Sequence, residues 1–339
     1  MHEVHDLRVY DRVFLEMGAS DLRAPFPWFG GKSKVAALVW KAFGDVPNYV
    51  EPFFGSGAVL LGRPHTPRLE TVNDKDGFIV NFWRAVKSAP EEVAMYADNP
   101  VFENDLHARH IWLVNQRDSL VPRLEGDPDY YDPKIAGWWV WGICSWIGGG
   151  WCSVGGPWSV VDGELTRNEQ HDAGVSRRLI HLSTSGMGVN SPCINVMSLL
   201  YNLSDRLRNT RIASGDWSRV CGYSTTAYNG LTGVFLDPPY SNDVGRSEVY
   251  VNDDFNVAND VRDWCIENGN NKLMRIALCG YEGEKHSILE DHGWTVYQWK
   301  SKGGYGNLGD GRGRENASKE RIWFSHYCLD ISPSQMSML

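Results

Sequence analysis

Apolar residues near the start of the chain recur first at helical and then at strand spacing. Apolar side chains share one face over 33–43, which predicts a helix that ends at the glycine after it. A short strand is expected over 48–51, and a helix is expected to begin at Ala58. A second strand over 71–74 ends in an acid, and a helix over 77–87 follows it.

The same alternation returns near the C-terminus. A short apolar strand is expected over 233–236, and another is expected over 273–279. A helix over 282–291 and two closing strands, over 295–299 and 321–327, complete the pattern. Strands that alternate with helices predict an α/β protein with a parallel, doubly wound sheet and a ligand at the carboxyl ends of its strands.

The stretch between these two parts, over 95–215, lacks this alternation. It contains 7 of the 15 tryptophans, 6 of them between Trp138 and Trp158, together with glycine-rich turns. The simplest interpretation is an inserted domain that is mainly helical or irregular. We therefore predict a sheet domain from 23–95 and 210–328, an insertion over 96–209, an N-terminal extension over 1–22 and a C-terminal tail over 329–339.

Composition narrows the class of protein. The 339 residues are 42% hydrophobic and 22% charged, as in ordinary globular proteins, and the net charge is −9. There is no apolar run long enough to span a membrane, and the charged start does not have the pattern of a signal peptide, so we expect a cytoplasmic protein. The 7 cysteines have no CxxC spacing, which favours reduced thiols over disulfides or a zinc site. An acidic total still allows a local basic groove for nucleic acid.

A glycine-rich turn follows the first expected strand. Gly55 and Gly57 allow a ligand to approach the backbone closely, and the helix after them offers free N–H groups. The third glycine of a dinucleotide fingerprint is absent, because Leu60 occupies its position. Asp74 lies where an acid commonly accepts hydrogen bonds from ribose hydroxyls. The turn and the acid together favour a ligand site over a plain corner between strand and helix.

The most informative motif is Asp237-Pro238-Pro239-Tyr240, directly after a short apolar strand. The two prolines fix the backbone and remove N–H donors, so the carbonyl groups remain as acceptors. Asp237 adds a carboxylate, and Tyr240 adds a flat aromatic face. Such a pocket fits an amino group on a planar base, because acceptors that hold both N–H bonds out of the ring plane direct the lone pair toward an electrophile. The alternative is a proline-stiffened turn without a ligand.

Four motifs, in this order, resemble those of the Dam-type DNA adenine-N6 methyltransferases. They are WFGGK over 28–32, VEPFFGSG over 50–57, Asn73-Asp74, and DPPY over 237–240. The similarity covers both ends of the expected sheet domain. It implies S-adenosylmethionine as the methyl donor, a Rossmann-like methyltransferase sheet, and target recognition by the insertion. It implies no metal, because the sulfonium is already an activated leaving group.

The resemblance also implies roles for single residues. Trp28 and Lys32 match the N-terminal motif that closes over the cofactor, and Asp74 matches the ribose acid. The loop around the methionine part of the cofactor is matched by Glu51, Pro52, Phe53, Gly55 and Gly57. Asp216 resembles a weaker motif that places an acid near the cofactor's adenine. The catalytic motif is matched by Asp237, Pro238, Pro239 and Tyr240.

The implied reaction acts on an adenine that is flipped out of double-stranded DNA and stacked on Tyr240. Asp237 and the Pro238 carbonyl hold the amine for in-line attack on the methyl group. The same acceptors would serve cytosine N4 or an amino group in RNA, so both remain alternative substrates. A catalytically silent DNA-binding protein of the same fold is a further alternative, which the complete motifs disfavour.

DNA contacts are expected at basic and aromatic positions. The stretch 300–321 has 6 Lys or Arg residues against 3 acids and includes Arg312 and Arg314, which favours phosphate contacts. Trp151 and Trp158 are candidates for stacking on bases or wedging between them.

Three further arginines lie on or beside an expected helix over 198–209, and they either contact DNA or form the solvent-exposed face of that helix: Arg206, Arg208 and Arg211. The sequence predicts neither the recognition site in DNA nor the oligomeric state.

Overall fold

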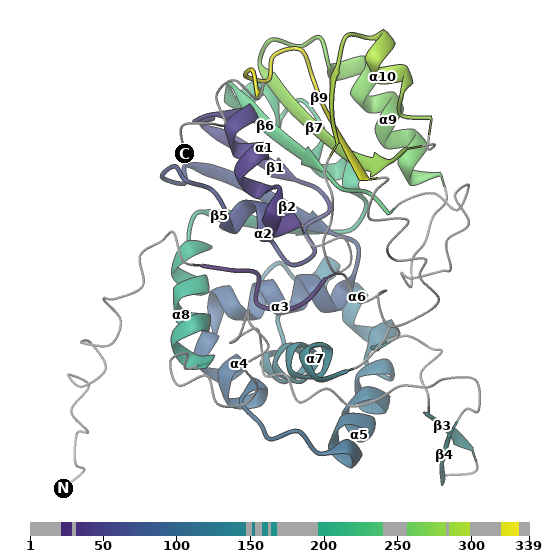
Figure 1. The fold of residues 1–339 in the computed structure, drawn as a ribbon. Coiled ribbons are helices and arrows are strands. Elements are labelled where there is room, and N and C mark those ends of the chain that lie inside the picture. The colour runs from purple at the N-terminus through teal and green to yellow at the C-terminus, as the bar shows by residue number, and fades with distance from the viewer. Residues whose placement is uncertain are drawn as a thin grey trace, which may run out of the picture.

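The chain folds around a seven-stranded sheet with strand order β5-β2-β1-β6-β7-β9-β8 (Figure 1). The computed structural model describes residues 22–28, 32–146, 151–152, 158–161, 164–167, 196–239, 256–282, 285–298 and 320–331. The strands are β1 (Asn48–Glu51), β2 (Leu69–Asp74), β5 (Thr210–Ser214), β6 (Thr232–Leu236), β7 (Met274–Tyr281), β8 (Thr295–Gln298) and β9 (Glu320–Phe324). The strands from β5 to β7 in that order pair in parallel, and β9 runs antiparallel to both of its neighbours.

Side chains of the central strands alternate between two hydrophobic cores, because successive residues of a strand point to opposite faces. In β1, Tyr49 packs into the core on one face and Val50 packs into the core on the other. In β6, Phe235 and Leu236 divide in the same way. Both strands are buried at every residue, as expected for parallel strands that helices cover on both sides.

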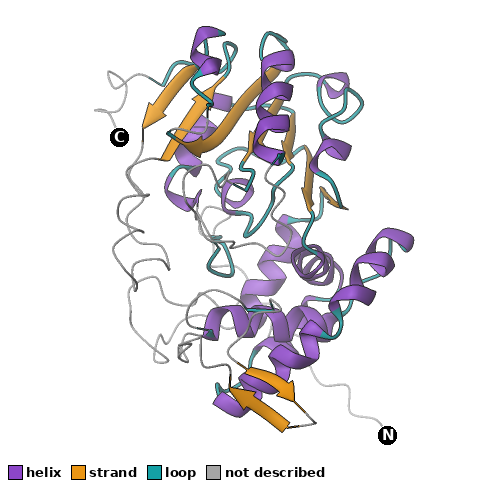
Figure 2. Cartoon of the chain, turned by 90° about the vertical axis from the view of Figure 1, so that its right-hand side faces the viewer, coloured by secondary structure: helices purple, strands orange, loops and turns teal. Residues whose placement is uncertain are grey.

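Helices cover both faces of the sheet (Figures 1 and 2). The first core contains side chains of α1 (Ala36–Phe43), α2 (Ala58–Leu61) and α3 (Gly77–Ser88). The second core contains side chains of α9 (Val257–Asn268), α10 (Ile288–Asp291) and the 3-10 helix η4 (Trp217–Val220). This arrangement confirms the α/β class and the doubly wound sheet that the sequence predicts.

The segment that follows α3 and precedes β5 is mainly helical, with a small hairpin. Its elements are α4 (Pro90–Ala97), α5 (Glu103–Val114), α6 (Arg117–Gly126), α7 (Pro133–Ser145), β3 (Trp158–Val161), β4 (Glu164–Arg167) and α8 (Val196–Arg206). Trp139 of α7 packs edge-on against Phe26, with 4.9 Å between ring centroids. The first core therefore continues from the sheet into these helices. The boundaries of the insertion at 96 and 209 stay a prediction.

The prediction of a helix over 282–291 is wrong in the length of the helix. Among the described residues of this range, 282 and 285–291, α10 (Ile288–Asp291) is the helix that forms. Lys285 has a φ of 60°, a left-handed conformation that a continuous right-handed helix cannot contain. The His286 side chain is also buried, which fixes the turn before the helix.

Candidate active site

A pocket opens at the carboxyl ends of β1, β2, β5 and β6, and the strand order reverses between β1 and β6. Open α/β sheets bind their ligands at such a reversal. Most residues that the sequence singles out line this pocket: Trp28, Lys32, Glu51, Pro52, Phe53, Gly55, Asp74, Asp216, Asp237 and Pro239. The fold thus brings motifs from both ends of the sheet domain into one site.

The other expected site residues have different positions. Gly57 is the N-cap of α2, and Pro238 is buried directly after β6. Trp158 begins the strand β3 of the hairpin. Tyr240, Arg312 and Arg314 lie outside the described residues.

The glycine turn has a backbone that only glycine adopts readily. Gly55 and Gly57 have φ angles of 47° and 68°, in the left-handed region. A Cβ on Gly55 would lie 2.6 Å from an indole carbon of Trp28, so this indole covers the turn closely. The Gly55 carbonyl accepts a hydrogen bond of 2.9 Å from the Trp83 indole N–H, which fixes the turn to α3.

The end of β2 organises the turn through two polar side chains. Asp74 accepts hydrogen bonds of 2.9 Å from the backbone N–H of Gly55 and from that of Asp76. The neighbouring Asn73 amide donates to the carbonyls of Pro52 at 3.1 Å and Gly215 at 3.0 Å. Asn73 therefore joins the ends of β1, β2 and β5. In the sequence, Asn73 stands out only as part of the Asn73-Asp74 motif.

Burial raises the pKa of the Asp74 carboxyl to about 7, although the N–H groups of Asp76 and Gly55 partly oppose this shift. The ordinary value is 3.8, so the folded state holds this proton over an interval in which the unfolded chain releases it. Because the folded state binds more protons there, Asp74 lowers the free energy of unfolding as pH rises from about 4 to about 7.

We therefore expect Asp74→Asn to reduce the loss of thermal stability between about pH 4 and about pH 7. Thermal unfolding of the ligand-free protein, followed by circular dichroism, measures this loss. Asp263→Asn is the control, because Asp263 is an exposed acid on α9 and should leave the loss unchanged. The same loss in Asp74→Asn and in the parent protein would contradict the expectation.

Glu51 is a buried acid in the wall of the pocket. Its Oε2 accepts a hydrogen bond of 2.8 Å from the Tyr49 hydroxyl. Burial holds the pKa of the Glu51 carboxyl well above its ordinary value, and repulsion from Asp237 adds to this shift. A cation in the pocket would remove part of this cost, so the site favours a positively charged ligand near Glu51.

Asp237 forms an ion pair with Lys32, with 2.9 Å between Oδ2 and Nζ. Lys32 is buried in a region that also contains Cys279 and Glu320. Burial lowers the pKa of the Lys32 ammonium, but attraction to Asp237, Cys279 and Glu320 outweighs it and raises the pKa above its ordinary value. Lys32, which the sequence predicts to close over a cofactor, thus also forms a charged contact with the acid of the proline motif, Asp237.

A flat apolar wall completes the pocket. The rings of Phe53 and Trp217 are nearly parallel, with centroids 6.2 Å apart and an angle of 25°. Asp216 precedes this tryptophan, and its carboxylate accepts a hydrogen bond of 3.0 Å from the Ser218 N–H. Trp217 lines the pocket but is absent from the expected site residues. Its place after Asp216 in the Gly-Asp-Trp triplet is the signal that could have identified it.

Trp151 packs within the helical segment and is partly buried, and its expected contact with DNA bases stays a prediction. It packs against Trp146 at 5.3 Å and His110 at 5.4 Å between ring centroids. Its indole N–H donates to the Trp139 carbonyl at 3.0 Å, and Gly142 leaves space for its ring. Packing within the helical segment therefore occupies this side chain.

Two further observations concern metal ions and membranes. No cluster of His, Cys, Asp and Glu side chains within the described part of the chain is arranged to hold a metal ion. None of the helices that the structure describes is long and apolar enough to cross a membrane.

The sheet has an antiparallel strand, β9, near one edge, and its pocket lies where the strand order changes direction between β1 and β6. Both features are consistent with a Rossmann-like methyltransferase fold. Comparison with known families makes the class specific. Residues 28–123 match the model of the D12 class N6 adenine-specific DNA methyltransferase family. This match supports an adenine-specific DNA methyltransferase, an enzyme that moves a methyl group from a donor to DNA.

The matched segment contains the glycine turn and Asp74, and it ends before the proline motif. No curated protein matches the sequence.

Proposed function

We propose that the chain transfers a methyl group from S-adenosylmethionine to N6 of an adenine that is flipped out of double-stranded DNA in the cytoplasm. The observation that carries this proposal is the common pocket of Asp237, Asp74 and the glycine turn. A pocket with acceptors at one end and a glycine turn at the other suits a base amine and a nucleoside cofactor together.

The residues present fit this cofactor. Asp74 offers carboxylate oxygens to ribose hydroxyls, and the rings of Phe53 and Trp217 offer an apolar surface to a purine. The acids Glu51 and Asp237 suit a ligand with positively charged ammonium and sulfonium groups. When bound, S-adenosylmethionine supplies a methyl group that its sulfonium has already activated.

The protein's own contribution is positioning. The Asp237 carboxylate and the Pro238 carbonyl accept hydrogen bonds from the N6 amine and orient its lone pair toward the methyl carbon. The prolines contribute no N–H that would compete for these acceptors. Lys32 holds the Asp237 carboxylate in place through the ion pair at 2.9 Å.

We also assign target recognition to the mainly helical insertion. We assign phosphate contacts to Arg312 and Arg314, which lie outside the insertion in the basic stretch 300–321. The insertion adjoins the pocket, because Trp139 of α7 lies 6.4 Å from Trp28 between ring centroids. Trp158 and its hairpin stay candidates for a base contact.

The experiment that tests the proposal is methyl transfer with purified protein, radiolabelled S-adenosylmethionine and either DNA or RNA. The expected result is labelled N6-methyladenine after digestion of the DNA to nucleosides. Labelled N4-methylcytosine, or label in RNA alone, would replace the proposed acceptor with one of the alternatives. Binding of cofactor and DNA without any transfer would instead indicate a catalytically silent DNA-binding protein.

A further inference from the structure

The helix α2, Ala58–Leu61, follows the glycine turn, and its first two residues line the pocket. A helix of one turn is not stable alone, because nucleation costs more than its few hydrogen bonds return. Its terminal N–H and C=O groups also need partners from outside the helix. The backbone N–H groups of Gly62 and Arg63 bind carbonyls of α2 locally, and side chains from distant elements join α2 to the rest of the fold.

Two side chains bind the carbonyl groups of α2. The Trp40 indole N–H donates to the Val59 carbonyl at 2.7 Å. The Arg206 guanidinium donates through Nη2 to the Leu60 carbonyl at 2.9 Å. On the pocket side, the backbone N–H of Leu60 lowers the pKa of the Glu51 carboxyl and so partly opposes the effect of burial. Leu60 therefore lies between a pocket acid and Arg206.

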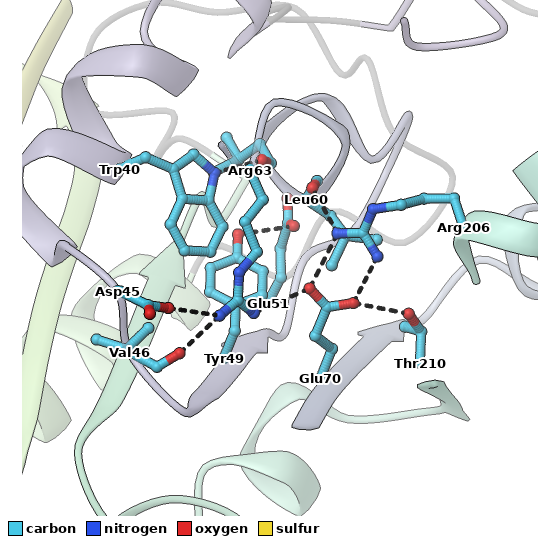
Figure 3. Close-up of polar contacts among 11 residues, drawn as sticks. Trp40, Asp45, Val46, Tyr49, Glu51, Leu60, Arg63, Glu70, Arg206 and Thr210 are labelled. Atoms are coloured by element: carbon cyan, nitrogen blue, oxygen red, sulfur yellow. Dashed lines mark hydrogen bonds and ion pairs between the residues drawn. The ribbon is translucent and has the colours of Figure 1, made fainter. Parts of the chain in front are cut away.

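A buried carboxylate holds Arg206 in this position (Figure 3). Glu70 accepts hydrogen bonds from Arg206 Nη1 at 2.7 Å and from Arg206 Nη2 at 2.9 Å, a bidentate pair. Glu70 also accepts from Arg63 Nη1 at 3.1 Å and from the Thr210 hydroxyl at 2.9 Å. The Glu70 and Arg63 side chains are fully buried, and 8% of the Arg206 side chain is exposed.

Arg206 is the last residue of α8, the helix that leads from the insertion back to the sheet. The sequence suggested a DNA contact or a solvent-exposed face for this arginine, and the structure corrects both. Arg208, two residues further on, does point outward: 76% of its side chain is exposed, and it pairs with Asp205. The two arginines therefore have the same charge and lie close together in the chain, but Arg206 is buried and Arg208 is exposed.

We propose that Arg206 is a positioning residue for methyl transfer, which fixes α2 and the cofactor wall of the pocket to the end of α8. This inference rests on the proposed function, because it assigns α2 to the binding of S-adenosylmethionine. Arg206 itself lines no part of the pocket and acts through the Leu60 carbonyl. Its loss weakens cofactor binding and leaves the transfer step intact once cofactor is bound.

The geometry makes the guanidinium hard to replace. Its Nη2 binds Leu60 and Glu70 together, while Nη1 holds the second oxygen of Glu70. A lysine has one ammonium on a flexible stem and cannot reproduce this planar fork. Arg206→Lys therefore keeps a positive charge beside Glu70 but loses the fixed bond to α2, which separates positioning from simple charge balance.

The test compares Arg206→Met, Arg206→Lys and the control Arg208→Met in the full chain. Isothermal titration with S-adenosylmethionine, without DNA, gives Kd, and steady-state methylation of DNA gives KM and kcat. We expect both Arg206 variants to raise Kd and KM for S-adenosylmethionine about tenfold, with kcat at saturation within about twofold of the parent protein. Arg208→Met should match the parent protein in all three quantities.

Parental affinity in a folded Arg206 variant would overturn the inference, as would an equal loss in Arg208→Met. If Arg206→Met fails to fold, Arg206→Lys decides, because it retains the charge beside Glu70. Restoration of parental Kd by Arg206→Lys would reduce the role of Arg206 to charge balance. Failure of the proposed function looks different, because the parent protein and Arg208→Met would then also fail to bind S-adenosylmethionine.

Discussion

Asp237→Asn is expected to lower the rate of methyl transfer by about 10²–10³-fold, with cofactor binding largely retained. The asparagine keeps the size of the side chain but turns one acceptor oxygen into an N–H donor, which opposes the N–H bonds of the adenine amine. Radiolabelled methyl transfer under single-turnover conditions measures the rate, and titration with S-adenosylmethionine measures binding.

The variant also changes the surroundings of Lys32, since the ammonium loses its carboxylate partner at 2.9 Å. Thermal unfolding must therefore accompany the kinetics, because an uncompensated buried charge destabilises a protein. Asp263→Asn serves as the control on an exposed acid. A folded Asp237→Asn protein that binds cofactor and transfers methyl groups at the parental rate would remove the proline motif from the mechanism.

Gly55→Ala is expected to weaken cofactor binding on the order of 100-fold, equivalent to about 2.7 kcal/mol. The added Cβ meets the Trp28 indole at 2.6 Å, and a φ of 47° is unfavourable for any residue with a Cβ. The turn or the tryptophan must move to remove the close contact or the unfavourable backbone angle, and both line the pocket. Titration with S-adenosylmethionine measures the effect.

Gly222→Ala is the matched control for Gly55→Ala. Gly222 also lies in a turn, but a Cβ there would meet nothing within 4 Å, and its φ is not in the left-handed region. We expect parental cofactor affinity in this variant. Parental affinity in Gly55→Ala as well would show that the turn is not part of the cofactor site.

The parts of the site that the sequence predicts are those with a local backbone signal. Gly55 and Gly57 indicate a left-handed turn because other residues avoid it, and Pro238 and Pro239 indicate an end to a strand. The strands around these motifs follow from short apolar runs between such breaks. Sequence reasoning could therefore place two halves of one pocket before any contact between them was known.

The contacts that sequence reasoning missed join segments that are far apart in the chain. Lys32 and Asp237 meet only because β6 pairs beside β1, and Arg206 reaches Glu70 only because β5 pairs beside β2. No local pattern separates buried Arg206 from exposed Arg208. The packing of Trp151 was not predicted for a related reason: flanking glycines indicate a loop but do not reveal the indoles against which it packs.

The packing of Trp139 against Phe26 limits how the enzyme can be redesigned. A chimera that replaced 96–209 with the corresponding segment of another enzyme would exchange not only the segment to which we assign target recognition but also the support behind Trp28. It would also exchange Arg206. Grafts that retain α7 and the end of α8, and vary the hairpin and its flanks, preserve the packing behind the pocket while the rest of the segment changes.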